Sequence, residues 1–232
     1  MATAHNPPPL LVLVCKRPSP GVGKQRIAAI LGKERTAELA ERLLACALED
    51  LRSWPHATAI SIASEADLPW ARAQLPTAEV VAQKGGNLGE RISDTCRQLD
   101  TVQRPVLLIG SDAPELSSTY LKDCLRALDH ADVVLGQAED GGVVVMGAKT
   151  PWPALDSLPW STAALGAALQ AQCENCGLTV AVRPPLCDID RYDQLDDLAH
   201  RIASDERPAR RELHRWLTTQ MTAESRTRRM SV

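Results

Sequence analysis

Two short, unbroken apolar runs constrain the fold of this chain more than any other feature of its sequence. The runs are Leu10 to Cys15 and Pro105 to Gly110, and each has the length of one β-strand. A strand without polar residues at alternate positions is buried on both faces, as the inner strands of a parallel sheet are. Helices normally cover both faces of such a sheet, so the two runs predict an α/β protein.

The remaining sequence alternates between strand-length and helix-length segments. Further strands are expected over residues 57–63, 79–82, 131–136, 143–147 and 178–182. Helices are expected over about 34–51, 67–74, 88–99, 118–128, 161–176, 192–203 and 208–220, with Ser117 or Ser118 and Ser161 as caps. This order predicts an α/β/α sandwich with a mostly parallel central sheet, formed by residues 1–220 as one domain. The polar segment 221–232 is expected to be a disordered tail.

Composition argues against several other classes of protein. The chain has 232 residues, of which 44% are hydrophobic and 24% charged, as in one soluble globular domain. A formal net charge of -3, with only five Trp and two Tyr and no Phe, argues against a nucleic-acid binder. No apolar run approaches the ~20 residues of a membrane span. No signal-peptide pattern is seen and the seven Cys are scattered, so we expect a cytoplasmic protein without a disulfide framework.

A loop rich in Pro and Gly follows the first apolar run. In parallel sheets, ligands bind beyond the carboxyl ends of the strands, which is where this loop lies. Small, kinked residues let backbone N–H groups approach an anion, and basic side chains add charge and hydrogen-bond donors. The loop residues expected to bind phosphate are Lys16, Pro20, Gly21, Lys24 and Arg26. On composition alone, an ordinary surface loop is an equal alternative.

Acidic residues follow three of the expected strands. Asp112 comes directly after the second apolar run and could hold Mg²⁺ together with phosphate oxygens, or could cap the next helix. Asp188 and Asp190 alternate in an extended segment, so both point to one side and could hold one cation or face solvent. The spacing of Glu139 to Gly142 favours a hairpin turn. Because the basic loop, Asp112 and Asp188 all follow strands, we expect them to converge on one edge of the sheet.

Six segments resemble, in their order and spacing, the motifs of one known family. They are the Lys-x-Pro-x-Pro-Gly-x-x-Lys-x-Arg loop within 14–26, Gln83 with 87–91, the Gly-Ser-Asp strand end at 108–116, the Asp-Gly-Gly turn at 135–142, Trp160–Thr162 and 188–190. The family consists of small bacterial proteins with a GT-A-like fold. They are provisionally assigned as glycosyltransferases, and are described either as a domain of unknown function or as radical-SAM/selenodomain-associated transferases. More distant relatives are the guanylyltransferases of molybdenum-cofactor and 2-phospholactate metabolism.

The resemblance covers about residues 10–198 and implies a role for each matching residue. It implies that Lys24 and Arg26 hold phosphates and that Gln83 and Arg91 lie near the base or the donor. It implies that Asp112 and Asp188 hold Mg²⁺ or Mn²⁺, and that Asp140 contacts the sugar or the metal. The residues implied on the acceptor and sugar side are Gly141, Gly142, Trp160, Ser161 and Thr162.

The implied function is metal-dependent transfer from a nucleotide-activated donor, with Asp112 and Asp140 as catalytic residues. A glycosyltransferase that uses a nucleotide-diphospho-sugar and a small-molecule acceptor is the leading interpretation. One alternative is a nucleotidyltransferase that joins a nucleoside monophosphate to a small phosphorylated acceptor, and another is a nucleotide-binding protein without turnover. Val143 and Val144 stand where the family usually has two Tyr, so the substrate is left open. Inversion would need a general base, for which Glu139 and Asp140 are equal candidates.

Overall fold

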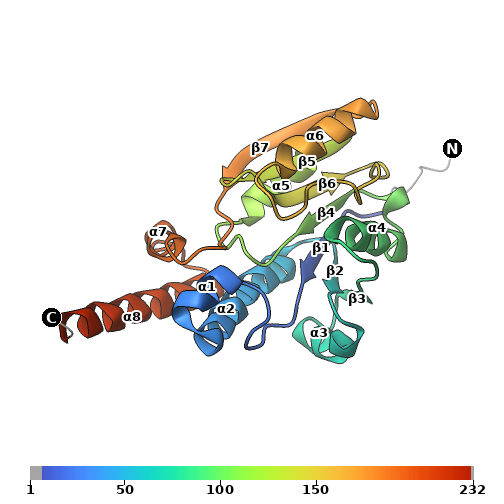
Figure 1. Ribbon diagram of the computed structural model, residues 1–232. Coiled ribbons are helices and arrows are strands. Elements are labelled where there is room, and N and C mark those ends of the chain that lie inside the picture. The colour runs from blue at the N-terminus through green and yellow to red at the C-terminus, as the bar shows by residue number, and fades with distance from the viewer. Residues whose placement is uncertain (1–6, 231–232) are drawn as a thin grey trace.

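The computed structural model describes the backbone of residues 7–230 and the side chains of 7–220 except that of Gln103. Its centre is one seven-stranded sheet in the order β3-β2-β1-β4-β6-β5-β7, shown in Figure 1. The strands are β1 Leu10–Cys15, β2 Ala57–Ile62, β3 Glu79–Ala82, β4 Val106–Ile109, β5 Val133–Ala138, β6 Val143–Ala148 and β7 Val180–Leu186. Every neighbouring pair is parallel except those that include β6. The predicted α/β fold with a mostly parallel sheet is therefore confirmed.

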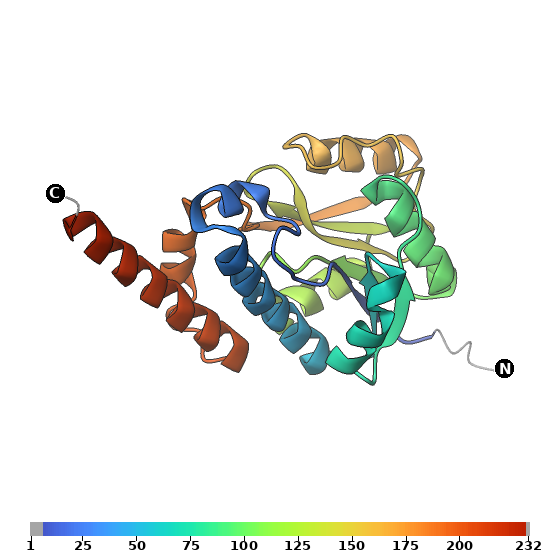
Figure 2. The same ribbon diagram turned by 60° about the horizontal axis from the view of Figure 1, so that its bottom comes forward.

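Helices cover both faces of the sheet, as Figures 1 and 2 show. Side chains of α2 Lys33–Ser53, α3 Leu68–Gln74 and α5 Ser118–Ala127 share one apolar core with the sheet. Those of α4 Leu88–Gln98 and α6 Leu165–Asn175 share the core on the opposite face. The remaining helices are α1 Gln25–Leu31, α7 Gln194–Arg201 and α8 Pro208–Met230, with short 3₁₀ turns at Glu65–Asp67 and Thr101–Gln103. Among the described helices, none is both long and apolar enough to cross a membrane.

A third apolar cluster lies away from the sheet, where α1, α7 and α8 pack on the outer side of α2. Its members include Ile27, Leu39, Leu198, Leu213 and Trp216, all of which are buried. This cluster explains why α1 exists although the sequence predicted no helix before Glu34. Burial of Ile27 stabilises a helix too short to show a clear periodic pattern.

Several other boundaries differ from the predictions, and three of the differences have a structural reason. Ser161 does not cap α6, because the helix begins later, at Leu165, and the hydroxyl of Thr162 accepts from the N–H of Ala164 at 3.3 Å. β7 extends past the predicted end at Val182, since an edge strand tolerates proline. α8 continues beyond Gln220 because no Pro or Gly follows to end it. Residues 231–232 of the predicted tail lie outside the described residues, and its disorder stays a prediction.

A buried ion-pair network fastens α8 to α2. The side chain of Arg210 is fully buried and donates to the carboxylates of Asp50 at 2.6 Å and Glu49 at 2.9 Å. It also donates to the carbonyls of Pro114 at 3.0 Å and Leu116 at 3.1 Å, in the segment after β4. The segment that follows Asp112 is therefore held directly by α8.

Candidate functional site

The carboxyl ends of β1, β4 and β7 bring together the predicted loop and two predicted acids. The ammonium Nζ of Lys24 lies 3.0 Å from Oδ1 of Asp112 and also donates to the carbonyl of Ile189. The N–H of Ile189 donates to the carbonyl of Asp112 at 2.9 Å, which fixes the neighbouring Asp188 beside the end of β4. The predicted convergence of these three segments on one edge of the sheet is confirmed.

Lys24 is held in an unusual way. Its backbone has a left-handed conformation, with φ 46°, and its side chain is only 7% exposed. A non-glycine residue in that conformation has a strained backbone, which the surrounding contacts must compensate. The ammonium group is therefore fixed at the sheet edge rather than extended into solvent.

Negative charge exceeds positive charge around Asp188. The pKa of Asp188 is raised to about 7, first by burial and then by the charge of Asp112, while Lys24 lowers it. Asp140 and Asp190 also raise the pKa of Asp188, so three other carboxylates act on this residue. Such a cluster favours the binding of a further cation.

The donor set at this edge fits a divalent ion that arrives with a phosphate. Among the described side chains, no group of three or more His, Cys, Asp and Glu residues is arranged to hold a metal by itself. Mg²⁺ is commonly held by one or two carboxylates, with phosphate oxygens and waters as its other ligands. Asp112 and Asp188 would supply the two carboxylates.

The turn between β5 and β6 carries the fourth acid, and the predicted hairpin is confirmed. The N–H of Gly141 donates to the carbonyl of Ala138 at 3.0 Å, and the N–H of Gly142 donates to Oδ1 of Asp140 at 3.0 Å. Because β6 is antiparallel, this turn lies at the same edge as the carboxyl ends of the other strands. Asp140 is exposed there.

The two acids of this turn, which the sequence left unranked, differ in their partners. Arg201 donates to Oε1 of Glu139 at 2.6 Å and to Oε2 at 3.3 Å. Both oxygens of Glu139 are thus already engaged by the guanidinium, which leaves the side chain less free to meet an acceptor hydroxyl. Asp140 is therefore the better candidate for a general base.

Gly141 joins this turn to the predicted acceptor segment. Its φ is 91°, and a Cβ placed on it would lie 2.1 Å from the carbonyl oxygen of Ala163. The N–H of Gly166 donates to the carbonyl of Gly141 at 2.9 Å. Packing against Ala163 therefore requires a residue without a side chain at position 141.

Replacement of Gly141 by Ala should destabilise the protein by about 1–3 kcal/mol, the usual cost of a strained backbone conformation. Chemical denaturation would measure the change in the free energy of unfolding. Gly110→Ala is the matched control, because a Cβ there would meet no atom within 4 Å and its φ is not positive. Equal stability of the two variants would contradict the packing role of Gly141.

The predicted acceptor residues are held mainly by bonds within their own segment. The indole N–H of Trp160 donates to the carbonyl of Leu155 at 2.7 Å, and its half-buried ring packs on the core shared with α4 and α6. The hydroxyl of Thr162 donates to the carbonyl of Pro159 at 2.7 Å. Ser161 is exposed and has a left-handed backbone, with φ 63°. Contact of these residues with an acceptor stays a prediction.

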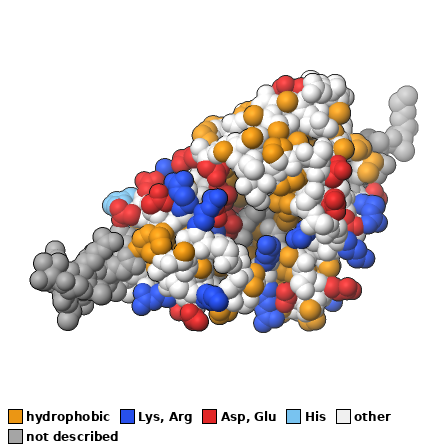
Figure 3. All heavy atoms as spheres, viewed as in Figure 1, with side chains coloured by type: hydrophobic (Ala, Val, Ile, Leu, Met, Phe, Trp, Pro, Cys, Tyr) orange, Lys and Arg blue, Asp and Glu red, His pale blue; other side chains and the backbone are white. Residues whose placement is uncertain are grey.

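The remaining loop residues surround Lys24. Nη1 of Arg26 lies 2.6 Å from Oδ2 of Asp190, and both side chains are well exposed. Nε2 of Gln25 donates to the carbonyl of Gly21 at 2.9 Å, which helps to hold the loop. Lys16 and Pro20 are exposed. On the face drawn in Figure 3, basic and acidic side chains are interleaved over α1 and α7, beside a central hollow.

Gln83 and Arg91 have structural partners. Nε2 of Gln83 donates to the carbonyl of Ser61 at 2.8 Å and bridges the ends of β2 and β3. Nε of Arg91 donates to the carbonyl of Gly86 at 3.1 Å and holds the Gly-rich turn before α4. Within the described part of the chain, neither is bonded to Asp112 or Asp188. Their predicted place near a nucleotide base stays a prediction.

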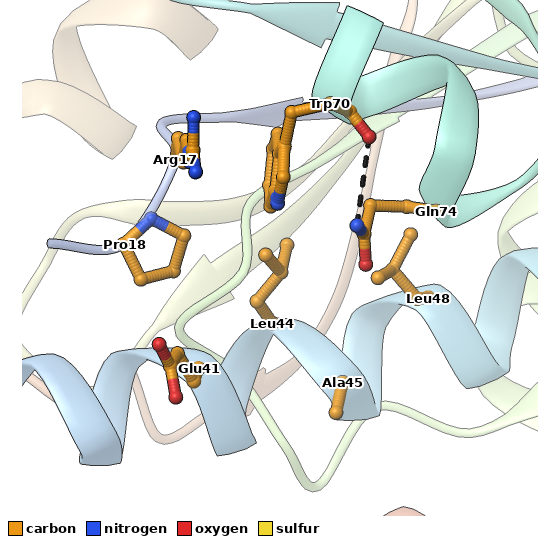
Figure 4. Close-up of a pocket in the computed structure, with 8 residues that line it drawn as sticks. All are labelled: Arg17, Pro18, Glu41, Leu44, Ala45, Leu48, Trp70 and Gln74. Carbon is orange, nitrogen blue, oxygen red and sulfur yellow. Dashed lines mark hydrogen bonds between the residues drawn. The ribbon is translucent and has the colours of Figure 1, made fainter. Parts of the chain in front are cut away.

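A cavity of about 330 Å³, drawn in Figure 4, lies beside the loop between α2 and α3. Its apolar wall includes Leu44, Leu48 and Trp70. The guanidinium of Arg17 stands over the ring of Trp70, 5.7 Å from its centroid. This cavity could not be predicted from the sequence, because its lining comes from α2, α3 and the loop at Arg17 and Pro18, which are separate in the chain.

Comparison with solved structures identifies the class of fold. One structure, from Desulfovibrio desulfuricans G20, is provisionally described as a nucleotide-diphospho-sugar transferase. It is 25% identical, the match covers 92% of this chain and 95% of that chain, and the TM-score is 0.79. The sheet and its acidic edge therefore belong to a protein with the nucleotide-diphospho-sugar transferase fold. A sequence profile of the uncharacterised bacterial family DUF2064 matches residues 36–162, more than half of the chain, so the chain belongs to that family.

More distant structures show the fold alone. Rv0371c of Mycobacterium tuberculosis H37Rv is 14% identical, over 83% of this chain and 98% of that chain, with a TM-score of 0.51. The 4-diphosphocytidyl-2C-methyl-D-erythritol synthase of Anaerococcus prevotii DSM 20548 is 12% identical, over 85% and 96%, with a TM-score of 0.54. No curated protein matches the sequence significantly. The nearer likeness and the site together support an enzyme of the glycosyltransferase or nucleotidyltransferase kind.

Proposed function

We propose that this protein is a metal-dependent transferase that uses a nucleotide-activated donor, with a nucleotide-diphospho-sugar as the leading donor. The observation that carries the proposal is the meeting of Lys24, Asp112 and Asp188 at the carboxyl edge of the sheet. The likeness to the D. desulfuricans protein favours a sugar nucleotide.

The proposed chemistry follows from where charge develops. Cleavage of a bond to a diphosphate leaves negative charge on the departing phosphates, and cations fixed beside them stabilise the transition state. Lys24 and Arg26 would bind the phosphates, and Mg²⁺ or Mn²⁺ held by Asp112 and Asp188 would neutralise further charge. Asp140 is the candidate base that removes the proton of the acceptor hydroxyl.

The same groups would also serve nucleotidyl transfer, in which an acceptor phosphate attacks the α-phosphate of a nucleoside triphosphate. The two reactions differ in their products. Glycosyl transfer releases a nucleoside diphosphate, whereas nucleotidyl transfer releases inorganic diphosphate. A protein that binds nucleotide but forms no product with any donor and acceptor would fit the third interpretation, binding without turnover.

A thermal-shift screen tests the proposal. The ligands are UDP, GDP, CDP, ADP, dTDP and the matching triphosphates, each with and without Mn²⁺ or Mg²⁺. A ligand at about 100 times its dissociation constant should stabilise the folded protein by about 2.7 kcal/mol. We expect one diphosphate to stabilise strongly only when metal is present. Nucleotide binding that ignores metal, or no nucleotide binding at all, would refute metal-dependent transfer.

The cytoplasmic location inferred from the sequence stays a prediction, as does the small-molecule acceptor.

A further inference from the structure

Arg201, in the last turn of α7, contacts three acidic side chains at once. Its Nε donates to Oδ2 of Asp197 at 2.6 Å, which fixes the side chain against its own helix. Nη1 lies 2.6 Å from Oε1 of Glu139 and 3.4 Å from Oε2 of Glu115, and Nη2 lies 3.3 Å from the other oxygen of Glu139. One guanidinium thus bridges segments that are far apart in the sequence.

Each partner of Arg201 lies close to one acid of the proposed site. Glu139 directly precedes Asp140 in the turn between β5 and β6. Glu115 lies in the loop that Asp112 opens after β4, and α7 itself follows the segment that carries Asp188. Arg201 therefore connects the three loops that present the acids.

Two hydrogen bonds from backbone N–H groups connect the same three loops around Cys187. The N–H of Glu139 donates to the carbonyl of Leu186 at 3.0 Å. The N–H of Cys187 donates to Oε2 of Glu115 at 3.3 Å. Cys187 itself is buried at this junction.

We propose that Arg201 is a positioning residue that holds the loops of Asp112, Asp140 and Asp188 in one arrangement. The fork of a guanidinium can bind two carboxylates in a fixed geometry, and an ammonium group cannot. A misplacement of about 1 Å in an active site can lower turnover by about 100-fold. The catalytic consequence rests on the proposed function, whereas the structural linkage does not.

Hydrogen exchange of the full chain, followed by mass spectrometry, tests the linkage without any ligand. Arg201→Gln should make the amides of 112–116, 138–142 and 186–191 exchange roughly tenfold faster, because local opening loses its bridging contacts. Arg201→Lys keeps the charge but not the fork, and should loosen the same three segments. Arg126→Gln is the control, since Arg126 makes an exposed pair with Asp123 within α5. If the amides of these three segments exchange at the wild-type rate in Arg201→Gln, the proposal is overturned.

Single replacements of the partners give a sharper pattern. Glu139→Gln should loosen 138–142 more than 112–116, and Glu115→Gln should do the reverse. Uniform loosening of the whole chain in either variant would indicate general destabilisation and would also overturn the proposal.

Kinetics with the nucleotide donor from the thermal-shift screen gives a second readout. Arg201→Gln should lower kcat by about 10- to 100-fold and change the KM for the donor much less, because the acids are displaced while the phosphate-binding loop is intact. An unchanged kcat would overturn the positioning role. If the wild-type protein binds no nucleotide while Arg201→Gln still loosens the three loops, the proposed function fails and the linkage stands.

Discussion

Asp112→Asn should abolish the metal-dependent stabilisation that a nucleotide gives the wild-type protein and should lower turnover by at least about 100-fold. An amide has no charge to offer a divalent ion. A metal ion in such a site supplies several kcal/mol of transition-state stabilisation, and about 1.36 kcal/mol corresponds to a factor of ten in rate. The thermal-shift screen and a product assay with the donor that it identifies would measure both effects.

The fold should survive this replacement. The backbone bond from Ile189 to the carbonyl of Asp112 does not depend on the side chain, and the carboxyl group of Asp112 is 43% exposed. Lys24 loses a charged partner, but the amide oxygen of Asn can still accept from its ammonium group, so the replacement should cost about 1–3 kcal/mol of unfolding free energy. Asp123→Asn, which removes an acid from α5, is the matched control. Unchanged metal-dependent nucleotide binding in Asp112→Asn would remove the central residue from the proposal.

Arg210→Met should lower the free energy of unfolding by about 3–5 kcal/mol, the usual cost of removing one partner of a buried ion pair. The change leaves Asp50 buried, with Arg207 at 3.0 Å as its remaining charged partner, and removes the Arg210 donor from the carbonyls of Cys46, Pro114 and Leu116. Urea denaturation would measure the loss. Arg211→Ala is the control, because the neighbouring Arg211 is exposed and its replacement should change stability by less than about 0.5 kcal/mol.

The loss in Arg210→Met should grow as the pH rises above about 6. The pKa of Asp50 is raised to about 6, because burial outweighs the lowering effects of Arg210 and Arg207. A carboxyl whose pKa is higher in the folded state than in the unfolded state loses stability as the pH rises between the two values. Without Arg210 the folded-state pKa of Asp50 rises further, so the loss extends to higher pH. A pH-independent difference between variant and wild type would contradict this account.

Most of the sheet could be predicted because its strands carry strong local signals. The runs ending at Cys15 and Gly110 are apolar throughout, and the predicted strands lie close to the observed β1 and β4. The sequence could not predict α1, since burial of Ile27 depends on helices from the far end of the chain. Nor could it predict the fully buried charge of Arg210, because a single Arg in a polar helix has no distinguishing pattern.

The convergence of the site could also be predicted, because strand ends of a parallel sheet meet at one edge. The partners within the site could not. Glu139 and Asp140 are equivalent in sequence, and only the position of Arg201 on α7 separates them. Similarly, the pairing of Lys24 with Asp112 depends on the left-handed backbone of Lys24. That conformation could not be predicted from the sequence, because non-glycine residues rarely adopt it.

The packing of Gly141 on Ala163 has a consequence for how relatives of this protein can diverge. The carbonyl of Ala163 occupies the space of a side chain at Gly141, one residue after Asp140, and follows directly on Trp160–Thr162. A change that shifts the backbone at Ala163 would therefore also shift the backbone of Gly141, directly after Asp140. If this segment selects the acceptor, such a change in acceptor preference would be coupled to the position of the candidate base.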